Sequence, residues 1–227
     1  MFDPIHIDQQ DVRYPPSLRL YFADRIPPAV IARGNLDLLH ETQHRPLVAL
    51  FCSVQCSEPV IQQTYALAHA LRDASVTVIS GFHSPLEKEC LSILLQGTQP
   101  VIVCPARGIE RLRLPASWRM AMEKKRLLLL SPFGEAQHRP TSARALVRNQ
   151  LIAALADVVF ITHATPGGKS ESFCHELATE GKPLLALDTV ENTNLFNLGA
   201  EPLHPEEITN GDSLLRKLGA NSVRHKL

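Results

Sequence analysis

The sequence has few aromatic residues, no net charge and no long apolar run. Aromatic side chains make up 5% of the 227 residues, and 23 basic residues balance 23 acidic ones. A neutral chain gains no overall attraction to nucleic acid or to membranes, so any anion-binding surface has to be local. No run approaches the roughly 18 apolar residues that indicate a transmembrane helix. The first residues, MFDPIHIDQQD, also lack the basic and apolar regions of a secretory signal. We therefore expect a cytoplasmic protein without membrane contact.

Cysteine and histidine are present, but not at the spacing of a metal site. The five cysteines are odd in number, and four of them lie in or beside apolar runs, as is typical of buried reduced thiols. Cys52 and Cys56 are not followed by a second cysteine pair, and the ten histidines form no helical pair with a carboxylate partner. We predict no bound metal and no cofactor.

Short apolar runs alternate with amphipathic segments along most of the chain. Strands are predicted for residues 46–53, 76–80, 100–104, 126–131, 157–164 and 183–188. Helices are predicted for residues 59–73, 85–96, 115–125, 141–155 and 171–181, with Gly181 ending the last one. Strands that are apolar throughout are covered on both faces, and strand–helix alternation is typical of doubly wound sheets. The predicted fold class is α/β, with a doubly wound, mostly parallel sheet.

We divide the chain into three parts. Residues 1–45 are rich in proline, contain one short possible strand, AVIARG, and are expected to form an N-terminal extension packed on the core. Residues 46–205 hold the strand–helix repeats and form the main domain. Residues 206–227 are expected to form a short helix, SLLRKL, followed by a basic end, RHKL.

The segment ATPGGKSES looks like the end of a phosphate-binding P-loop. That motif requires a glycine five residues before Gly168, where this chain has His163, so a mononucleotide P-loop is not predicted. An apolar strand still leads through Gly167 and Gly168 into a helix, and free N–H groups at a helix N-terminus favour an anion. We predict an anion-binding turn to which Lys169 adds charge. A plain turn capped by Ser170 is the alternative.

A second corner, SGFHSPLEKEC, lies at the end of another predicted strand. The strand ends at Ser80 and Gly81, and His83 lies at the top of the corner before the next helix. Ligands of open α/β sheets bind at the carboxyl ends of the strands. Ser80, Gly81 and His83 are therefore candidate ligand-binding residues. Adjacent residues such as His83 and Ser84 rarely face each other, so we predict no catalytic residue, and a polar capped turn is the alternative.

Positive charge is concentrated in one stretch of this neutral protein. Residues 107–148 contain ten basic and only three acidic residues. Such patches bind phosphate backbones, and Arg144 and Arg148 are four residues apart on one predicted helix face. The alternative is a solvated surface on which the charges are dispersed.

Taken in order, these segments resemble the DNA-processing protein A (DprA/Smf) family. The resemblance covers residues 14–203 and rests on YPPSL, ARGNLDLL, VALFCS, VTVISGF, PVIVCPARGIERLRLP, LLLLSPF, LVRNQLIAALADVVFIT, LATEGKPLLALD and NTNLFNLGAEPL. It implies an extended Rossmann-like fold, single-stranded DNA bound in a basic pocket at the strand ends, a homodimer, and loading of a RecA-type recombinase. The pocket residues that it implies are Ser53, Ser80, Gly81, Arg148, Asn149, Gly168 and Ser170.

Three segments depart from the family's pattern. The Gly-Ser-Arg after the first strand is here Cys52-Ser53-Val54. The Gly-Leu-Ala-x-Gly-Ile-Asp corner lacks its second glycine, and the Ser-Gly-Ser loop is here Gly168-Lys169-Ser170. The winged helix usual at the family's C-terminus is not expected here. The ligand is therefore predicted to be single-stranded DNA or a nucleotide-like anion.

Three functions are compared from the sequence. The first is a DprA-like binding protein without its own chemistry, in which Arg148 and Lys169 pair with phosphate and Arg144 lies at the rim. Single-strand binding also uses aromatic stacking, for which Phe82 and Phe133 are the candidates. The second is a nucleotide hydrolase of the LOG type, and the third is a nucleotide-sensing module.

The hydrolase has a specific obstacle in the sequence. The LOG loop reads Pro-Gly-Gly-x-Gly-Thr-x-x-Glu, and Cys174 stands where its catalytic glutamate belongs. Glu176 is two residues later and faces elsewhere on a helix. An acid or base would then have to come from His83, Glu87 or Glu176. We expect that the protein is not an enzyme.

Overall fold

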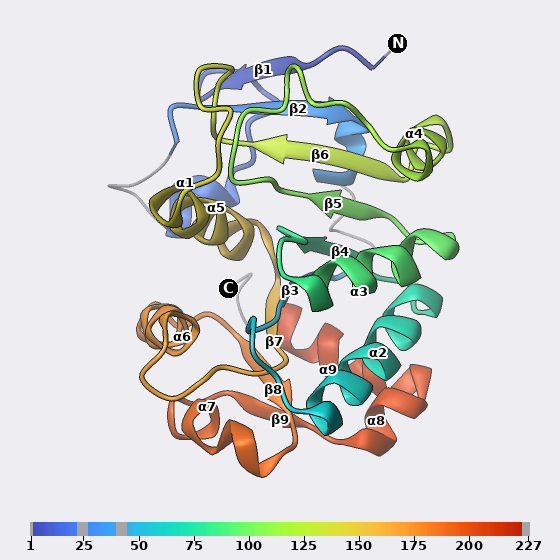
Figure 1. Ribbon diagram of the computed structural model, residues 1–227, viewed down its shortest axis with the longest axis vertical. Helices are drawn as coiled ribbons and strands as arrows, with labels where there is room; N and C mark the ends of the chain where they lie inside the picture. Colours follow the sequence, from blue (N-terminus) through green and yellow to red (C-terminus); the bar gives the residue numbers. More distant parts are fainter. Residues whose placement is uncertain (1, 22–26, 40–44, 224–227) are drawn as a thin grey trace.

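One nine-stranded sheet runs through the chain, of which the computed structural model describes residues 2–21, 27–39 and 45–223. The order across the sheet is β1-β2-β6-β5-β4-β3-β7-β8-β9, from top to bottom in Figure 1. The strands are β1 (Ile5–Asp8), β2 (Ala29–Gly34), β3 (Leu47–Phe51), β4 (Thr77–Ser80), β5 (Val101–Val103), β6 (Leu127–Ser131), β7 (Val158–Ile161), β8 (Leu184–Leu187) and β9 (Glu201–Leu203).

The strands from β6 to β9 across the sheet are parallel, and β2 and β1 are added antiparallel beyond β6. In the register, Val48 lies opposite Val78 on one side and opposite Val158 on the other. Every residue of β3, β4, β5, β6, β7 and β8 is buried, which explains why the sequence of these strands shows no polar alternation. The predicted α/β class with a mostly parallel sheet is confirmed.

Helices cover both faces of the sheet (Figure 1). One face packs against α1 (Ser17–Tyr21), η1 (Leu36–Leu39), α5 (Ser142–Leu155), α6 (Lys169–Thr179) and α7 (Thr193–Asn197). The other face packs against α2 (Glu58–Asp73), α3 (Pro85–Gln96), α4 (Ala116–Glu123), α8 (Pro205–Thr209) and α9 (Gly211–Val223). A short 3-10 helix, η3 (Val190–Asn192), precedes α7. Among the described helices, none has the length and apolar character required to cross a bilayer.

The structure adds elements that the sequence did not indicate. β1 and β9 are short, and β9 contains Pro202, so neither has the long apolar run of a central strand. The possible strand AVIARG is confirmed as β2, and residues 1–45 thus contribute two strands, β1 and β2, to the sheet itself. At the other end, α9 begins at Gly211 and is longer than the predicted SLLRKL helix, and α8 precedes it. The basic end RHKL lies outside the described residues.

The direction of the chain reverses at β3. From β3 it proceeds outward through β4, β5 and β6, and α5 then carries it back to β7 on the other side of β3. The loops after β3 and β7 therefore diverge from neighbouring strands. In an open α/β sheet this is where a ligand-binding crevice forms.

Candidate ligand-binding edge of the sheet

A groove of about 270 Å³ lies at the carboxyl ends of β3 and β7. We call it the switch-point groove. Its lining comes from the loop after β3 and from the turn after β7, and consists of Ser53, Val54, Gln55, Thr165, Gly168, Lys169 and Ser170. Four of the predicted ligand residues thus lie together in one hollow.

The turn after β7 is shaped by its two glycines. Gly167 has a φ of 71°, in the left-handed region that favours glycine, and Gly168 is the N-cap of α6. The helix therefore begins at Lys169, so Ser170 lies inside its first turn and is not the cap. This corrects the alternative in which Ser170 caps the helix. The Gly168 N–H donates to the carbonyl of Thr165 at 2.9 Å.

A carboxylate of the chain itself occupies part of this turn. Glu171 Oε2 accepts the Gly167 N–H at 2.7 Å, and Glu171 Oε1 accepts Nδ2 of Asn194 at 2.6 Å. The hydrogen bond from Asn194, followed by that from Gly167, lowers the pKa of Glu171. The N–H groups of Gly167 and Gly168 are thus already used within the turn, which leaves fewer free N–H groups for an anion than the sequence predicted. The exposed Lys169 remains as the positive charge of the groove.

Arg148 lies outside this groove, at the ends of β4 and β5. Its side chain is only 6% exposed. Nη1 donates to the Cys104 carbonyl at 3.1 Å, and Nε donates to Asn149 Oδ1 at 2.7 Å. Burial lowers the pKa of Arg148, while the carboxylate of Glu87 acts in the opposite direction. The predicted Arg148–Asn149 pair is therefore a hydrogen-bonded unit that lies at the ends of β4 and β5.

Gly81 allows Arg148 to occupy this position. A Cβ on Gly81 would overlap Nη1 and Cζ of Arg148. Ser80, directly before it, is fully buried and donates its hydroxyl to the Leu50 carbonyl at 2.6 Å. Both residues shape the edge, Gly81 through its missing side chain and Ser80 by joining β4 to β3.

Glu87 connects two loops of the edge, although the sequence offered it only as a general acid or base. Its Oε1 accepts the Cys52 N–H at 3.2 Å, and its Oε2 accepts the N–H groups of His83 at 2.7 Å and of Ser84 at 3.1 Å. The Ser84 hydroxyl in turn accepts the Glu87 N–H, which completes a capping box at the start of α3. The signal for this role was the Ser-x-x-Glu spacing. His83 itself is exposed at the top of the corner.

The basic residues of 107–148 do not form a single surface. Arg126 is buried and donates to the carbonyls of Leu95 and Gln99. Lys124 and Lys125 precede β6 and so lie at the amino edge of the sheet, opposite the groove. Arg144 is half-buried, and its Nη1 donates to the Arg139 carbonyl at 2.5 Å. Of the two possibilities left open by the sequence, the structure favours dispersed charges, because strands and helices carry these residues to different sides of the protein.

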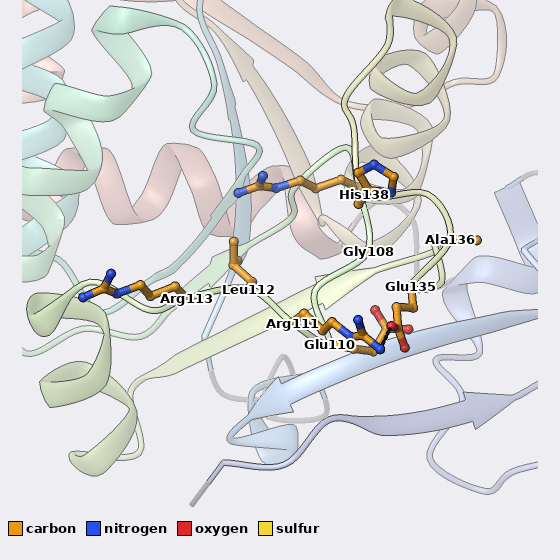
Figure 2. Close-up of a pocket in the computed structure, with 9 residues that line it drawn as sticks. Gly108, Glu110, Arg111, Leu112, Arg113, Glu135, Ala136 and His138 are labelled. Carbon is orange, nitrogen blue, oxygen red and sulfur yellow. Dashed lines mark ion pairs between the residues drawn. The ribbon is translucent and has the colours of Figure 1, made fainter.

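Three of these arginines nevertheless gather around a second, larger hollow of about 830 Å³ (Figure 2). We call it the arginine cavity. Its walls are the loops after β5 and β6, and its lining consists of Arg107, Gly108, Glu110, Arg111, Leu112, Arg113, Glu135, Ala136 and His138. Arg111 and Glu135 form an ion pair, and Figure 2 shows Arg113 lying apart from that pair. The sequence pointed to the charge but not to the cavity.

The two aromatic candidates for base stacking are not on the surface. Phe82 is 5% exposed and Phe133 is 6% exposed, since both side chains pack into the interior. That prediction was wrong: proximity to a strand end does not decide which way a side chain points. The exposed apolar residues beside Arg148 are Leu146 and Val147, which are 46% and 39% exposed on α5.

The cysteines are free and largely buried, and the residues that the structure describes contain no group of three or more His, Cys, Asp or Glu placed to hold a metal. Burial raises the pKa of Cys104 to about 12 and that of Cys174 to about 12. Such thiols do not act as nucleophiles near neutral pH. Glu176 accepts Nε2 of Gln150 at 2.8 Å, so it joins α6 to α5.

Two solved structures share this fold over nearly the whole chain. DNA processing protein A from Helicobacter pylori, described for its unique single-stranded DNA binding mode, has a TM-score of 0.74 and 20% identity, with 97% of each chain covered. DNA processing protein A (DprA) from Streptococcus pneumoniae has a TM-score of 0.73 and 22% identity, covering 95% of this chain and 74% of that one. At such identities the likeness shows the fold.

A more distant likeness marks the general architecture. The molybdenum cofactor carrier protein of Chlamydomonas reinhardtii has a TM-score of 0.52 and 11% identity over 78% of this chain and 99% of that one. No sequence among the curated proteins matches the chain.

The family is decided by the sequence itself. The family model of DNA recombination-mediator protein A matches residues 6–203. The match begins in β1 and ends with β9, so it includes the antiparallel strands, the parallel sheet and both hollows of its carboxyl edge. The chain therefore belongs to the DNA recombination-mediator protein A family.

Proposed function

We propose that the protein binds single-stranded DNA along the carboxyl edge of its sheet and acts in DNA processing and recombination, without chemistry of its own. The observation that carries this proposal is the switch-point groove, which lies where α/β sheets bind ligands and has Lys169 on one wall. Arg148 lies at the ends of the nearby strands β4 and β5. Family membership and the Helicobacter pylori relative, described for its single-stranded DNA binding mode, support DNA as the ligand.

The groove suits a phosphate backbone with low charge density. Lys169 is exposed and can form a charge-assisted hydrogen bond to a phosphate oxygen. Glu171, which occupies the neighbouring turn, opposes the binding of a compact, highly charged group such as a triphosphate. A diester chain, with one charge per nucleotide, is the better match. Leu146 and Val147 offer exposed apolar surface for bases in place of aromatic platforms.

The partners that follow from this role are a RecA-type recombinase and a second copy of the chain. The family resemblance supports both, and we propose a cytoplasmic location for the same reason. Size-exclusion chromatography with light scattering tests the homodimer, and coelution with a RecA-type protein on oligo(dT) tests the recombinase. A monomeric mass at micromolar concentration would contradict the dimer.

The direct test is a fluorescence anisotropy titration with labelled oligo(dT) at several salt concentrations. Lys169→Gln should weaken binding severalfold at low salt and reduce the salt slope by about 0.7, the value for one lost phosphate contact on a single strand. Lys124→Gln is the matched control, because it removes the same charge at the opposite edge. Wild-type protein that does not bind at low salt would refute the proposal.

Competition with free nucleotides separates DNA binding from the nucleotide-sensing alternative. Excess nucleotide that displaces oligo(dT) from the groove, and that alone raises the melting temperature, would favour a nucleotide sensor. The hydrolase alternative is not favoured: Glu87 accepts three backbone N–H groups and Glu176 accepts Gln150, which leaves both carboxylates committed to the fold.

A further inference from the structure

We propose that the arginine cavity is a second phosphate site, which holds the phosphodiester backbone of the DNA strand after it leaves the switch-point groove. This inference rests on the proposed function. It adds a site that is separate from the groove and is built by different loops. The cavity is about 830 Å³, and its lining residues lie in the loops that follow β5 and β6.

The charges around the cavity define the chemistry of its ligand. Three arginines and two glutamates line it, and His138 is exposed at its rim. Glu135 neutralises Arg111 through their ion pair, whereas within the described residues Arg107 and Arg113 have no ion pair. The small net positive charge suits a phosphate with a single negative charge, such as a diester, better than it suits a di- or triphosphate.

The walls of the cavity are fixed by hydrogen bonds before any ligand arrives. Ser131 donates its hydroxyl to the Arg107 carbonyl at 2.7 Å, and the Gly108 N–H donates to the Gln137 carbonyl at 2.9 Å. The Gly134 N–H donates to Gln137 Oε1 at 2.7 Å. The two loops are thus held to each other and to the end of β6. A preformed site loses little conformational entropy when a ligand binds.

The Leu112 end of the cavity is fixed from another strand. Arg33, on β2, donates from Nη1 to the Leu112 carbonyl at 2.9 Å, and from Nε to the Phe2 carbonyl at 2.6 Å. Strand β2, which extends the sheet beyond β6, therefore supports the loop that carries Arg111 and Arg113.

The position of the cavity allows one single-stranded DNA segment to contact both the switch-point groove and the arginine cavity. The groove lies over β3 and β7 and the cavity over β5 and β6, so three strand spacings of about 4.8 Å, or roughly 14 Å, separate them along the sheet. Single-stranded sites cover roughly 4–16 nucleotides, so this span is within reach of one bound segment. Arg148, at the ends of β4 and β5, lies between the two hollows.

The experiment compares two double variants by anisotropy with oligo(dT) of increasing length. Arg107→Gln/Arg113→Gln removes the two arginines that have no ion pair. Lys124→Gln/Arg216→Gln removes the same charge from exposed residues that line neither hollow. With a long oligonucleotide, the cavity variant should bind roughly tenfold more weakly at low salt, and its salt slope should fall by about 1.4, because two phosphate contacts are lost. With a dinucleotide it should bind like the wild type.

The outcomes separate this inference from the proposed function. If the wild type does not bind oligo(dT), the proposed function is refuted, and with it the proposal that the arginine cavity holds the DNA backbone. If the wild type binds and the cavity variant keeps its full salt slope at every length, only the second site is wrong. A third outcome is that thymidine monophosphate binds the cavity through both arginines while the salt slope of oligo(dT) binding is the same in wild type and variant. In that case the ligand of the cavity is a free nucleotide, and the proposal that it holds the DNA backbone is overturned.

A second variant keeps the test decisive if the double variant does not fold. Glu135→Gln releases Arg111 from its ion pair on an exposed loop, so the fold should be unaffected. It should tighten binding of long oligo(dT) and increase the salt slope. Weaker or unchanged binding by Glu135→Gln would count against the cavity as a phosphate site.

Discussion

Gly81→Ala should destabilise the protein by displacing a buried arginine. The added Cβ would overlap Nη1 and Cζ of Arg148, a side chain that is only 6% exposed. The guanidinium has to move, and its hydrogen bond to the Cys104 carbonyl is lost. A hydrogen bond to a charged group contributes about 1.5–3 kcal/mol, and an unsatisfied buried carbonyl costs about 1–3 kcal/mol. Since the arginine recovers some solvation as it moves outward, we expect a net loss of about 2–4 kcal/mol.

Urea unfolding followed by circular dichroism measures this loss. Thermal unfolding is a second measurement: for a chain of this size 1 kcal/mol corresponds to about 2–4 °C, so the melting temperature should fall by roughly 4–16 °C. Gly211→Ala is the matched control, because its Cβ meets nothing within 4 Å and its φ is not in the left-handed region. The control should be neutral or stabilising by a few tenths of a kcal/mol.

A double-mutant cycle identifies the cause. In an Arg148→Ala background the guanidinium is absent, so adding Gly81→Ala should cost almost nothing. The coupling free energy between the two substitutions should therefore equal the cost of Gly81→Ala in the wild type, about 2–4 kcal/mol. Additive effects, or a Gly81→Ala protein as stable as the wild type, would refute the argument that Gly81 is a glycine in order to make room for Arg148.

Three further predictions concern the carboxylates and thiols near this edge. Glu171→Gln removes a negative charge beside the groove, so oligo(dT) should bind roughly threefold more tightly at low salt in an anisotropy titration, with the gain vanishing at high salt. Glu87→Gln leaves one acceptor oxygen for three backbone N–H groups, so urea unfolding should show that the free energy of unfolding falls by about 2–3 kcal/mol. A loss below about 1 kcal/mol would contradict the role of Glu87 in joining the two loops. Burial raises the pKa of Cys104, and likewise that of Cys174, from 9.0 to about 12, so each thiol keeps its proton in the folded state after the unfolded chain has lost it. Their contribution to stability is complete below pH 9 and falls between pH 9 and 12, by about 1.4 kcal/mol per thiol at pH 10. Comparing wild type with Cys104→Ala at pH 8 and pH 10 isolates this effect, and the wild type should lose more stability between the two values.

The sequence determined most of the sheet by itself. The strands from β3 to β8 are apolar throughout because helices cover both of their faces, and this pattern is local and readable. The helix limits were also local: Gly181 has a φ of 72°, as expected for the residue that ends α6, and Ser84 caps α3. The ordered motifs together identified the family. Short edge strands such as β1 and β9 carry no such signal and escaped prediction.

The binding edge was decided only in part by the sequence. Strand order places the loops after β3 and β7 together, so the groove around Gly168 and Lys169 could be expected from topology alone. Topology does not show which polar groups in those loops are available to a ligand, because hydrogen bonds to residues distant in the sequence decide that. Glu171 uses the Gly167 N–H, and Ser80 is bonded to Leu50, thirty positions earlier in the chain.

Only the tertiary structure decided where the charges lie. The sequence left open whether the ten basic residues between 107 and 148 form one patch or are dispersed. In the folded protein Arg126 is buried, Lys124 lies at the amino edge of the sheet, and Arg107 lines the arginine cavity. Phe82 points inward for the same kind of reason, since the direction of a side chain at a strand end depends on what packs above it. Local pattern determines which elements form, whereas long-range packing determines which of their side chains remain available to a ligand.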